Sequence, residues 1–132
     1  MIVVIDASAA AEVILQRDQS ASLISIIAEA DWVIAPTVYI AEMTNVFWKY
    51  QKHTDLSESD CEQHLDHAIA LPDDFINDRD LYREAYKLGC TIDHSTYDML
   101  YLILARRQNA TLLTMDKKLR LKAKESNVTT HL

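Results

Sequence analysis

The stretch Ile2-Val3-Val4-Ile5-Asp6 decides the fold. Four β-branched residues in a row are typical of a buried strand, and the alanine-rich residues 7–15 that follow them favour a helix. Comparable apolar runs return at residues 32–35 and 111–114, and each precedes a helical stretch. Short apolar runs that alternate with helices predict an α/β domain, in which helices cover both faces of a mainly parallel sheet.

The rest of the chain divides into further helices and two weaker strands. Asp74 to Ile76 is a weakly signalled third strand, and Val128 to His131 is a candidate edge strand. Thr37 and Ser95 are expected to cap helices, the latter through a capping box. Gly89, the only glycine, is expected to end its helix in the left-handed conformation. We expect helices near residues 19–30, from Val38 to Lys52, Leu56 to Leu71, Arg79 to Leu88, Ser95 to Gln108 and Lys117 to Ser126.

Length and composition limit the class of protein. With 132 residues, of which 49% are hydrophobic and 25% charged, the chain fits a single domain over residues 1–132. No apolar run approaches the roughly 20 residues of a membrane span, and no signal peptide is recognised. We therefore expect a cytoplasmic protein that does not contact a membrane. Cys61 and Cys90 are expected to be thiols rather than a disulfide.

The net charge of −7 argues against a protein that coats nucleic acid, because such proteins neutralise phosphates with Lys and Arg. The charge does not exclude a nuclease, since a site of clustered carboxylates is anionic until divalent cations fill it. Basic residues do concentrate between Lys117 and Lys124. This run is either a solvated helix face or a rim that follows a nucleic-acid backbone.

Two acidic residues directly follow predicted strands. Asp6 comes after Ile5, and Asp116 comes after the run Leu112-Leu113-Thr114-Met115. Ligands bind beyond the carboxyl ends of parallel strands, so both side chains are placed to face one crevice. The alternative for each residue is that it only caps the helix that follows.

Two further acids lie on predicted helices. Glu42, Asn45 and Lys49 form a polar stripe that either faces a site, with Lys49 near a phosphate, or is solvated. Asp98 opens the segment 99–104, which is apolar all round, and a buried carboxylate is costly without a cation or donors. The expected core face of the Glu42 helix consists of apolar residues at three- and four-residue spacing, namely Ile40, Met43, Phe47 and Tyr50.

Convergent carboxylates are the expected ligands of Mg²⁺ or Mn²⁺, which prefer hard oxygen atoms and act on phosphates. A zinc site on Cys61, His64 and His67 is rejected, because three-residue steps drift around a helix and no fourth ligand lies nearby. We expect His94 to be an exposed loop residue rather than a proton-transfer group. Asp93 beside it is a candidate outer acid of the site.

Four motifs follow one another at suitable spacing along nearly the whole chain. They are Val4-Ile5-Asp6-Ala7-Ser8, Ile40-Ala41-Glu42-Met43-Thr44-Asn45-Val46, Tyr97-Asp98-Met99-Leu100-Tyr101-Leu102-Ile103-Leu104-Ala105 and Leu112-Leu113-Thr114-Met115-Asp116-Lys117-Lys118-Leu119. Together they resemble the PIN-domain nucleases, and within that family the VapC-type toxins of bacterial and archaeal toxin–antitoxin pairs.

The resemblance implies a three-layer α/β/α sandwich and a Mg²⁺- or Mn²⁺-dependent endoribonuclease that cuts single-stranded or looped RNA. A VapC-like member would also form a homodimer and be silenced by an antitoxin protein. Ser8, Asn45 and Thr114 match polar positions that hold the ligands in place. The family's catalytic, metal-binding positions are matched by the four acids Asp6, Glu42, Asp98 and Asp116.

On this hypothesis Asp6 and Asp98 hold the main metal, while Glu42 and Asp116 complete the cage or orient the attacking water. Trp48 lies away from the core face of its helix and is the candidate interface aromatic. Two alternatives stay open: a PIN-fold module that binds nucleic acid without catalysis, and a nuclease of RNA or DNA processing outside any toxin–antitoxin pair. The candidate contacts to the RNA backbone are Lys49, Lys117, Lys118 and Arg120.

Overall fold

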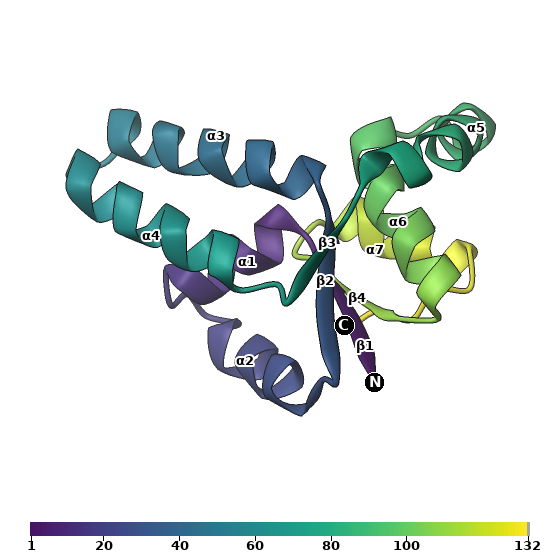
Figure 1. Cartoon of the computed structure of the whole chain (residues 1–132), viewed down its shortest axis with the longest axis horizontal. Coiled ribbons are helices and arrows are strands. Elements are labelled where there is room, and N and C mark those ends of the chain that lie inside the picture. Colours follow the sequence, from purple (N-terminus) through teal and green to yellow (C-terminus); the bar gives the residue numbers. More distant parts are fainter. Residues whose placement is uncertain (132) are drawn as a thin grey trace.

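The computed structural model describes residues 1–131, and its central feature is an all-parallel sheet with strand order β3-β2-β1-β4 (Figure 1). The strands predicted at residues 2–5, 32–35, 74–76 and 111–114 are present with their ends within one residue. The C-terminal stretch joins β4 only through a bridge between Leu112 and Thr130, so within residues 1–131 the predicted edge strand is shorter than expected. The strands are β1 (Ile2–Ile5), β2 (Trp32–Pro36), β3 (Asp74–Ile76) and β4 (Thr111–Leu113).

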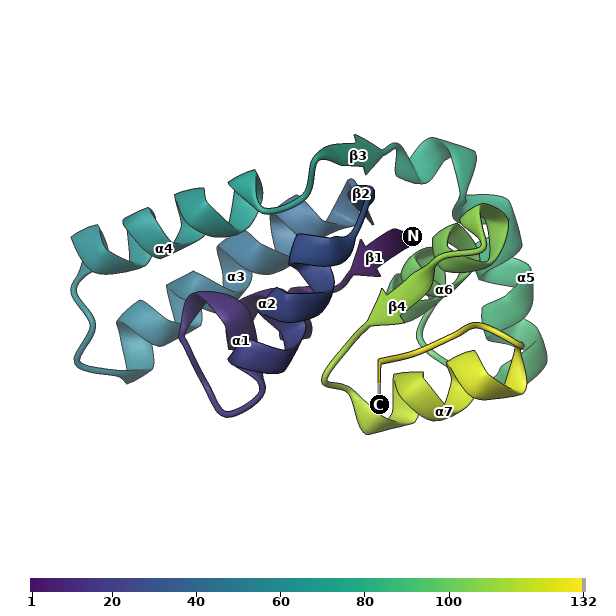
Figure 2. The same ribbon diagram turned by 90° about the horizontal axis from the view of Figure 1, so that it is seen from below.

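Helices cover the sheet on both sides, which confirms the predicted three-layer α/β/α architecture (Figures 1 and 2). On one side lie α1 (Ala7–Ile14), α2 (Ser20–Glu29), α3 (Val38–His53) and α4 (Glu58–Ala70). On the other side lie α5 (Tyr82–Ile92), α6 (Thr96–Gln108) and α7 (Lys117–Glu125), and the short 3-10 helix η1 (Asp78–Asp80) leads to α5. None of the helices in the described part of the chain is long and apolar enough to cross a membrane.

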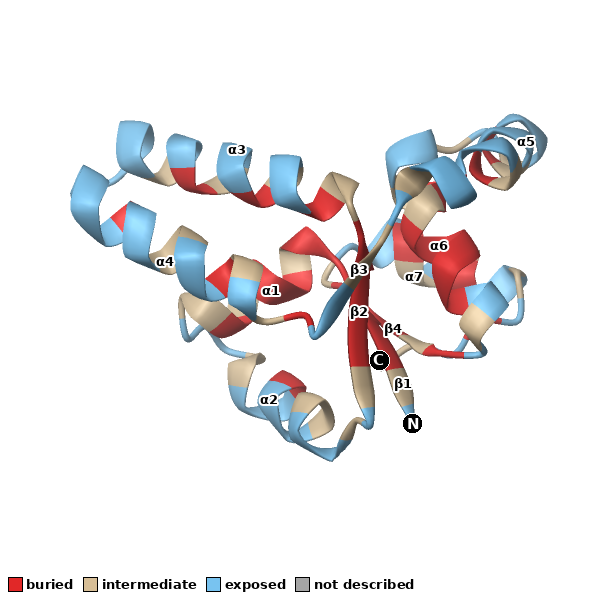
Figure 3. Cartoon of the chain, viewed as in Figure 1, coloured by how far each residue is buried: buried red, intermediate tan, exposed pale blue. Residues whose placement is uncertain are grey.

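The core runs through the strands and along α6 (Figure 3). The apolar segment that begins after Asp98 is buried at Met99 and from Tyr101 to Ala105, as its all-round hydrophobicity predicted. Because α6 packs against β1, β2 and β4, its first turn is carried to the carboxyl ends of the strands. The acid at position 98 is thereby placed at the edge of the sheet where ligands bind.

The predicted core face of α3 was wrong at one position. Ile40 is 41% exposed, whereas Tyr39, Met43 and Phe47 are buried at four-residue spacing. The Tyr39 hydroxyl donates a 2.6 Å hydrogen bond to the carbonyl of Ala68 on α4. Since this contact satisfies the phenol inside the core, the helix turns its inner face toward Tyr39 rather than toward Ile40.

Thr37 and Ser95 lie at the N-cap positions of α3 and α6 as predicted, but neither side chain makes the expected capping hydrogen bond. Thr37 has helical backbone angles, and its hydroxyl accepts a hydrogen bond from the backbone N–H of Asp78 instead of capping α3. The carboxylate of Asp78 accepts the N–H of Val38, so this distant acid caps the helix. Ser95 makes no capping hydrogen bond, and the carboxylate of Asp98, its expected partner, contacts His94. Sequence patterns cannot detect such replacements, since a neighbouring element supplies the partner.

Gly89 does not end a helix as predicted. Helix α5 begins at Tyr82 rather than Arg79 and continues through Gly89 to Ile92, and its C-cap Asp93 takes the left-handed conformation with φ of 52°. A Cβ atom at Gly89 would lie 2.9 Å from both the His94 carbonyl oxygen and Thr96 Cγ2. The glycine therefore allows the start of α6 to fold closely against α5.

We expect Gly89→Ala to lower the free energy of unfolding by about 1 to 2 kcal/mol. Overpacking costs about 1 to 3 kcal/mol, and the better helix propensity of Ala returns up to about 1 kcal/mol. Urea denaturation measures the change. Lys87→Ala, on the exposed face of the same helix, is the control and should stay within about 0.5 kcal/mol of wild type. A Gly89→Ala variant as stable as wild type would contradict the steric explanation.

Candidate active site

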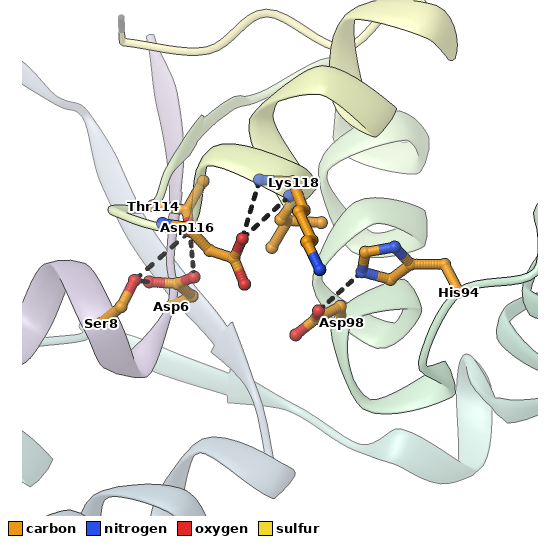
Figure 4. Close-up of polar contacts among 8 residues, drawn as sticks. Asp6, Ser8, His94, Asp98, Thr114, Asp116 and Lys118 are labelled. Carbon is orange, nitrogen blue, oxygen red and sulfur yellow. Dashed lines mark hydrogen bonds and ion pairs between the residues drawn. The ribbon is translucent and has the colours of Figure 1, made fainter.

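The carboxyl ends of β1 and β4 bring two of the predicted acids together. These strands are neighbours in the sheet, yet β1 leads to α1 on one face and β4 leads to α7 on the other. Open parallel sheets bind ligands at the point where the chain diverges in this way. Asp6 and Asp116 lie side by side at this point, and Asp98 faces them from α6 (Figure 4).

Asp6 is buried, with 6% of its surface exposed, and is held by three donors. Its Oδ1 accepts hydrogen bonds from Ser8 Oγ at 2.7 Å and from the backbone N–H of Ala9 at 2.9 Å. Its Oδ2 accepts a hydrogen bond from the Thr114 hydroxyl. The Ala9 contact is an N-cap of α1, so Asp6 both caps the helix and takes part in the acid cluster.

The two hydroxyl groups that bind Asp6 also join the ends of β1 and β4. Ser8 Oγ accepts the backbone N–H of Met115 at 2.9 Å, and Thr114 Oγ1 accepts that of Asp116 at 3.1 Å. The two oxygens are 3.3 Å apart. The structure thus places Ser8 and Thr114 beside the carboxylate that they were expected to support.

Burial raises the pKa of Asp6 from 3.8 to about 6, and the nearby charge of Asp98 adds to this effect. The hydrogen bonds from Ser8, Thr114 and Ala9 favour the carboxylate and limit the rise. Asp98 lies on α6 and Asp6 follows β1, yet the charge of Asp98 raises the pKa of Asp6. The two carboxylates therefore belong to one cluster.

Glu42 reaches the cluster from α3. Its Oε1 accepts a 2.6 Å hydrogen bond from the hydroxyl of Tyr101 on α6. Burial raises the pKa of Glu42, and the charges of Asp98 and Asp78 raise it further, whereas the Tyr101 hydrogen bond lowers it. The stripe on which Glu42 lies is therefore not a uniformly solvated face.

Asp98 forms a hydrogen bond with His94, whose Nε2 lies 2.8 Å from its Oδ2. The prediction that His94 is exposed was wrong, since only 12% of its side chain is accessible. The close turn between α5 and α6 folds the imidazole back onto the residue four positions later. The sequence did contain a signal for this contact, because His94 lies in a loop four residues before the candidate site acid Asp98.

The third acid of the cluster, Asp116, is exposed and caps α7. Its Oδ1 accepts the backbone N–H groups of Lys118 at 2.9 Å and Leu119 at 3.2 Å. Lys118 extends from α7 toward Asp98 without forming an ion pair with it (Figure 4). As with Asp6, capping and membership of the cluster are compatible.

Sequence reasoning missed Asp78, which follows β3 by two residues and acts electrostatically on Glu42. The signal was the same as for Asp6, an acid after a strand, but β3 is short and weakly marked. Three other predicted site residues form no hydrogen bond with the acids within residues 1–131. Asn45, Lys49 and Asp93 are exposed, and none of them makes a side-chain hydrogen bond within residues 1–131.

The donor set fits a divalent cation in its chemistry. Three acids use one carboxylate oxygen to bind the protein, and Glu42 Oε2, Asp98 Oδ1 and Asp116 Oδ2 accept no hydrogen bond from residues 1–131. In the same residues no Lys or Arg forms an ion pair with any of the four acids. As the side chains of the described residues stand, however, no three His, Cys, Asp or Glu groups are close enough to hold one ion. The pattern of Cys61, His64 and His67 likewise forms no metal site among the described residues, and the His64 ring stacks on Phe47.

Comparison with known proteins identifies the family. Residues 3–125, which include all four acids, match the PIN domain. The chain belongs to the PIN-domain family. PIN domains are nucleases, and they generally use divalent metal ions. A comparison with curated proteins gave no match for this PIN domain.

Two solved structures share the fold of this PIN domain. PAE2754 from Pyrobaculum aerophilum is 20% identical, with a TM-score of 0.77 over 99% of this chain and 84% of that one. VapBC2 from Rickettsia felis, bound to a DNA fragment from their promoter, is 18% identical, with a TM-score of 0.70 over 98% of this chain and 97% of that one. At 20% and 18% identity, the similarity to these two structures shows a shared fold and no more.

The raised pKa of Asp6 predicts that the metal-free protein loses stability as the pH rises. Below pH 3.8 the carboxyl is protonated in both folded and unfolded chains, so the contribution of this group is fully present. It is lost as the pH rises through about 6, because folding must then bury an anion. Between pH 4 and 7 the loss is roughly 2 kcal/mol.

Urea unfolding in chelator, compared between wild type and Asp6→Asn across this pH range, measures the effect. The Asn side chain keeps the shape but cannot ionise, so the difference between the two proteins isolates Asp6. The same pH dependence in both would contradict a raised pKa at this position.

Proposed function

We propose that this PIN nuclease is a Mg²⁺- or Mn²⁺-dependent endoribonuclease and the toxin of a toxin–antitoxin pair. The observation that carries the metal-dependent part is the buried carboxylate of Asp6, gathered with other acids and without a Lys or Arg partner in the described residues. Keeping like charges together in a partly desolvated place is unfavourable unless a cation offsets them. Perturbed carboxylates at a crevice are typical of functional sites.

In this proposal Asp6 and Asp98 would hold the cation, and Glu42 and Asp116 would complete the cage or orient the attacking water. A divalent ion bound there would lower the pKa of a bound water and stabilise negative charge on the phosphate. Glu42 Oε2, Asp98 Oδ1 and Asp116 Oδ2 accept no hydrogen bond within residues 1–131 and are available for this role. Asp6 Oδ2 accepts only the Thr114 hydroxyl and keeps a second lone pair for a ligand. His94 and Tyr101 would hold their acid partners in orientation.

The RNA substrate is proposed from the basic face of α7, which begins directly after Asp116. A groove of about 410 Å³ is lined by Lys117, Arg120, Leu121 and Lys124. Lys117 and Lys124 are about 10 Å apart along the helix axis, a span suited to successive phosphates of a single strand. Within residues 1–131 the only ion pair recorded on this helix joins Lys122 to Glu125, so these groove cations are free to meet phosphates.

The antitoxin partner is proposed from the similarity to the VapBC2 structure and from a second surface. A groove of about 480 Å³ between α3 and α4 contains Trp48, which is 54% exposed, and Glu58 and Glu62 lie along it. None of the four acids lines this groove. An apolar helix with basic residues would complement it, and we also propose that the chain forms a homodimer in the cytoplasm.

Cleavage of a mixed single-stranded RNA tests the proposed activity. Wild type should cut in Mg²⁺ or Mn²⁺ and stop in excess chelator, and both Asp6→Asn and Asp98→Asn should reduce the rate at least about 100-fold, since each removes a ligand charge. Asp66→Asn, an exposed acid on α4, is the matched control and should cut like wild type.

Purification must exclude host ribonuclease and bound antitoxin. Equal cutting by wild type and the two site variants would remove these acids from the reaction. A clean wild type that binds RNA but never cuts it would instead support a binding module without catalysis. A preference for structured DNA over RNA would favour a role in nucleic-acid processing outside a toxin–antitoxin pair.

The α7 groove predicts a strong salt dependence of RNA binding. In the inactive Asp98→Asn background, we expect replacement of Lys117, Arg120 and Lys124 by Gln to weaken binding. The slope of log K against log salt should fall in magnitude by about 2, since each lost phosphate contact removes about 0.7. Fluorescence anisotropy at several salt concentrations measures it. The control is a second triple variant of equal charge change on other helices, made at Lys52, Arg83 and Lys87.

A further inference from the structure

We propose that Tyr101 is a positioning residue for the cation site, which acts by fixing the carboxylate of Glu42. The inference rests on the proposed function, because Glu42 is there assigned to the metal cage. Tyr101 lies on α6 one turn after Asp98, and its hydroxyl donates a 2.6 Å hydrogen bond to Glu42 Oε1 on α3. No pattern in the sequence links these residues, which are 59 positions apart.

The hydrogen bond spans the two outer layers of the fold. Helices α3 and α6 lie on opposite sides of the sheet (Figures 1 and 2), and the hydrogen bond between Tyr101 and Glu42 joins them. The carboxylates of Asp98 and Glu42 carry like charges and repel each other. A donor anchored one turn from Asp98 therefore sets where the Glu42 carboxylate lies relative to it.

Tyr101 is suited to this task because it is rigid and a permanent donor. Only 1% of the residue is exposed, and α6 around it is core. A phenol is protonated at neutral pH, and the O–H of Tyr101 is the donor in the contact with Glu42 Oε1. The contact occupies Oε1 and leaves Oε2, which accepts no hydrogen bond within residues 1–131, for a ligand.

A purely structural explanation is that a buried phenol needs an acceptor. The chain contains a residue of that kind, because Tyr39 is buried and donates to the backbone carbonyl of Ala68, also at 2.6 Å. Tyr39→Phe and Tyr101→Phe thus remove the same group from the same kind of environment. Only the second removes it from a site carboxylate, so the pair separates positioning from stability.

The experiment measures Mn²⁺ affinity by calorimetry in metal-depleted buffer, together with unfolding in urea. We expect Tyr101→Phe to raise the Kd for Mn²⁺ about 10-fold, the usual effect of losing a partner that orients a ligand. Tyr39→Phe should leave the Kd unchanged although it is destabilised to a comparable degree. The Mn²⁺ concentration for half-maximal RNA cleavage should shift with the Kd, while the rate at saturating Mn²⁺ changes little.

A double-mutant cycle tests the route of action. If Tyr101 acts through Glu42, then Tyr101→Phe has no further effect on Mn²⁺ affinity in a Glu42→Gln background. A wild-type Kd in Tyr101→Phe, or an equal loss in both backgrounds, would overturn the inference. If the Tyr101 inference fails in this way while Asp6→Asn still abolishes Mn²⁺ binding in the same assay, the proposed function is retained. A wild type that binds no Mn²⁺ would overturn both.

Discussion

The burial of the Asp6 carboxylate, at the point where β1 ends beside β4, is the constraint on which the rest of the site depends. A carboxylate in this position loses water, and the donors Ser8, Ala9 and Thr114 replace only part of it, so its pKa stays raised. The strand order puts it there, since β1 and β4 are neighbours whose following helices diverge to opposite faces. Acids from other elements then converge on a place that already disfavours charge. Natural sequences tolerate such a local conflict chiefly where function requires it.

The hydrogen bonds of the acids show how the fold tolerates this crowding. Asp116 gives one oxygen to the first turn of α7, Glu42 gives one to Tyr101, and Asp98 gives one to His94. Each acid is thereby held in place by one oxygen while the other accepts no hydrogen bond from residues 1–131. Capping and chemistry are often treated as competing explanations of an acid after a strand, but here one side chain does both. Rigid placement and open coordination capacity come from the same group.

Much of the fold and part of the site could be predicted from local patterns. Periodicity located the strands and most helix bounds, and the rule that acids follow parallel strands located Asp6 and Asp116. The rule for glycine failed at Gly89, because that residue is required by a close approach between helices and not by its own backbone angles. Ile40 was misplaced by a rotation of about one residue around α3, which the buried hydrogen bond of Tyr39 decides.

Two of the missed parts of the site share one physical cause. Asp78 reaches Val38 and Tyr101 reaches Glu42 across 40 and 59 positions, so their partners are set by tertiary packing. His94 was missed for a different reason, since its partner is only four residues away. Its burial depends on how tightly α5 and α6 turn, and no residue-type pattern encodes that turn.

The parallel pairing of β1 with β4 has a consequence for the order in which the protein is made. Thr114 lies 108 positions after Asp6, so a ribosome must translate β2, β3 and six helices before β1 receives this neighbour. Until then the growing chain contains Asp6 but neither Thr114 nor Asp116, and the acid cluster is incomplete. Non-local pairings of this kind form late in folding. A nascent chain of this nuclease therefore stays without its assembled site while the messenger RNA that encodes it is still being read.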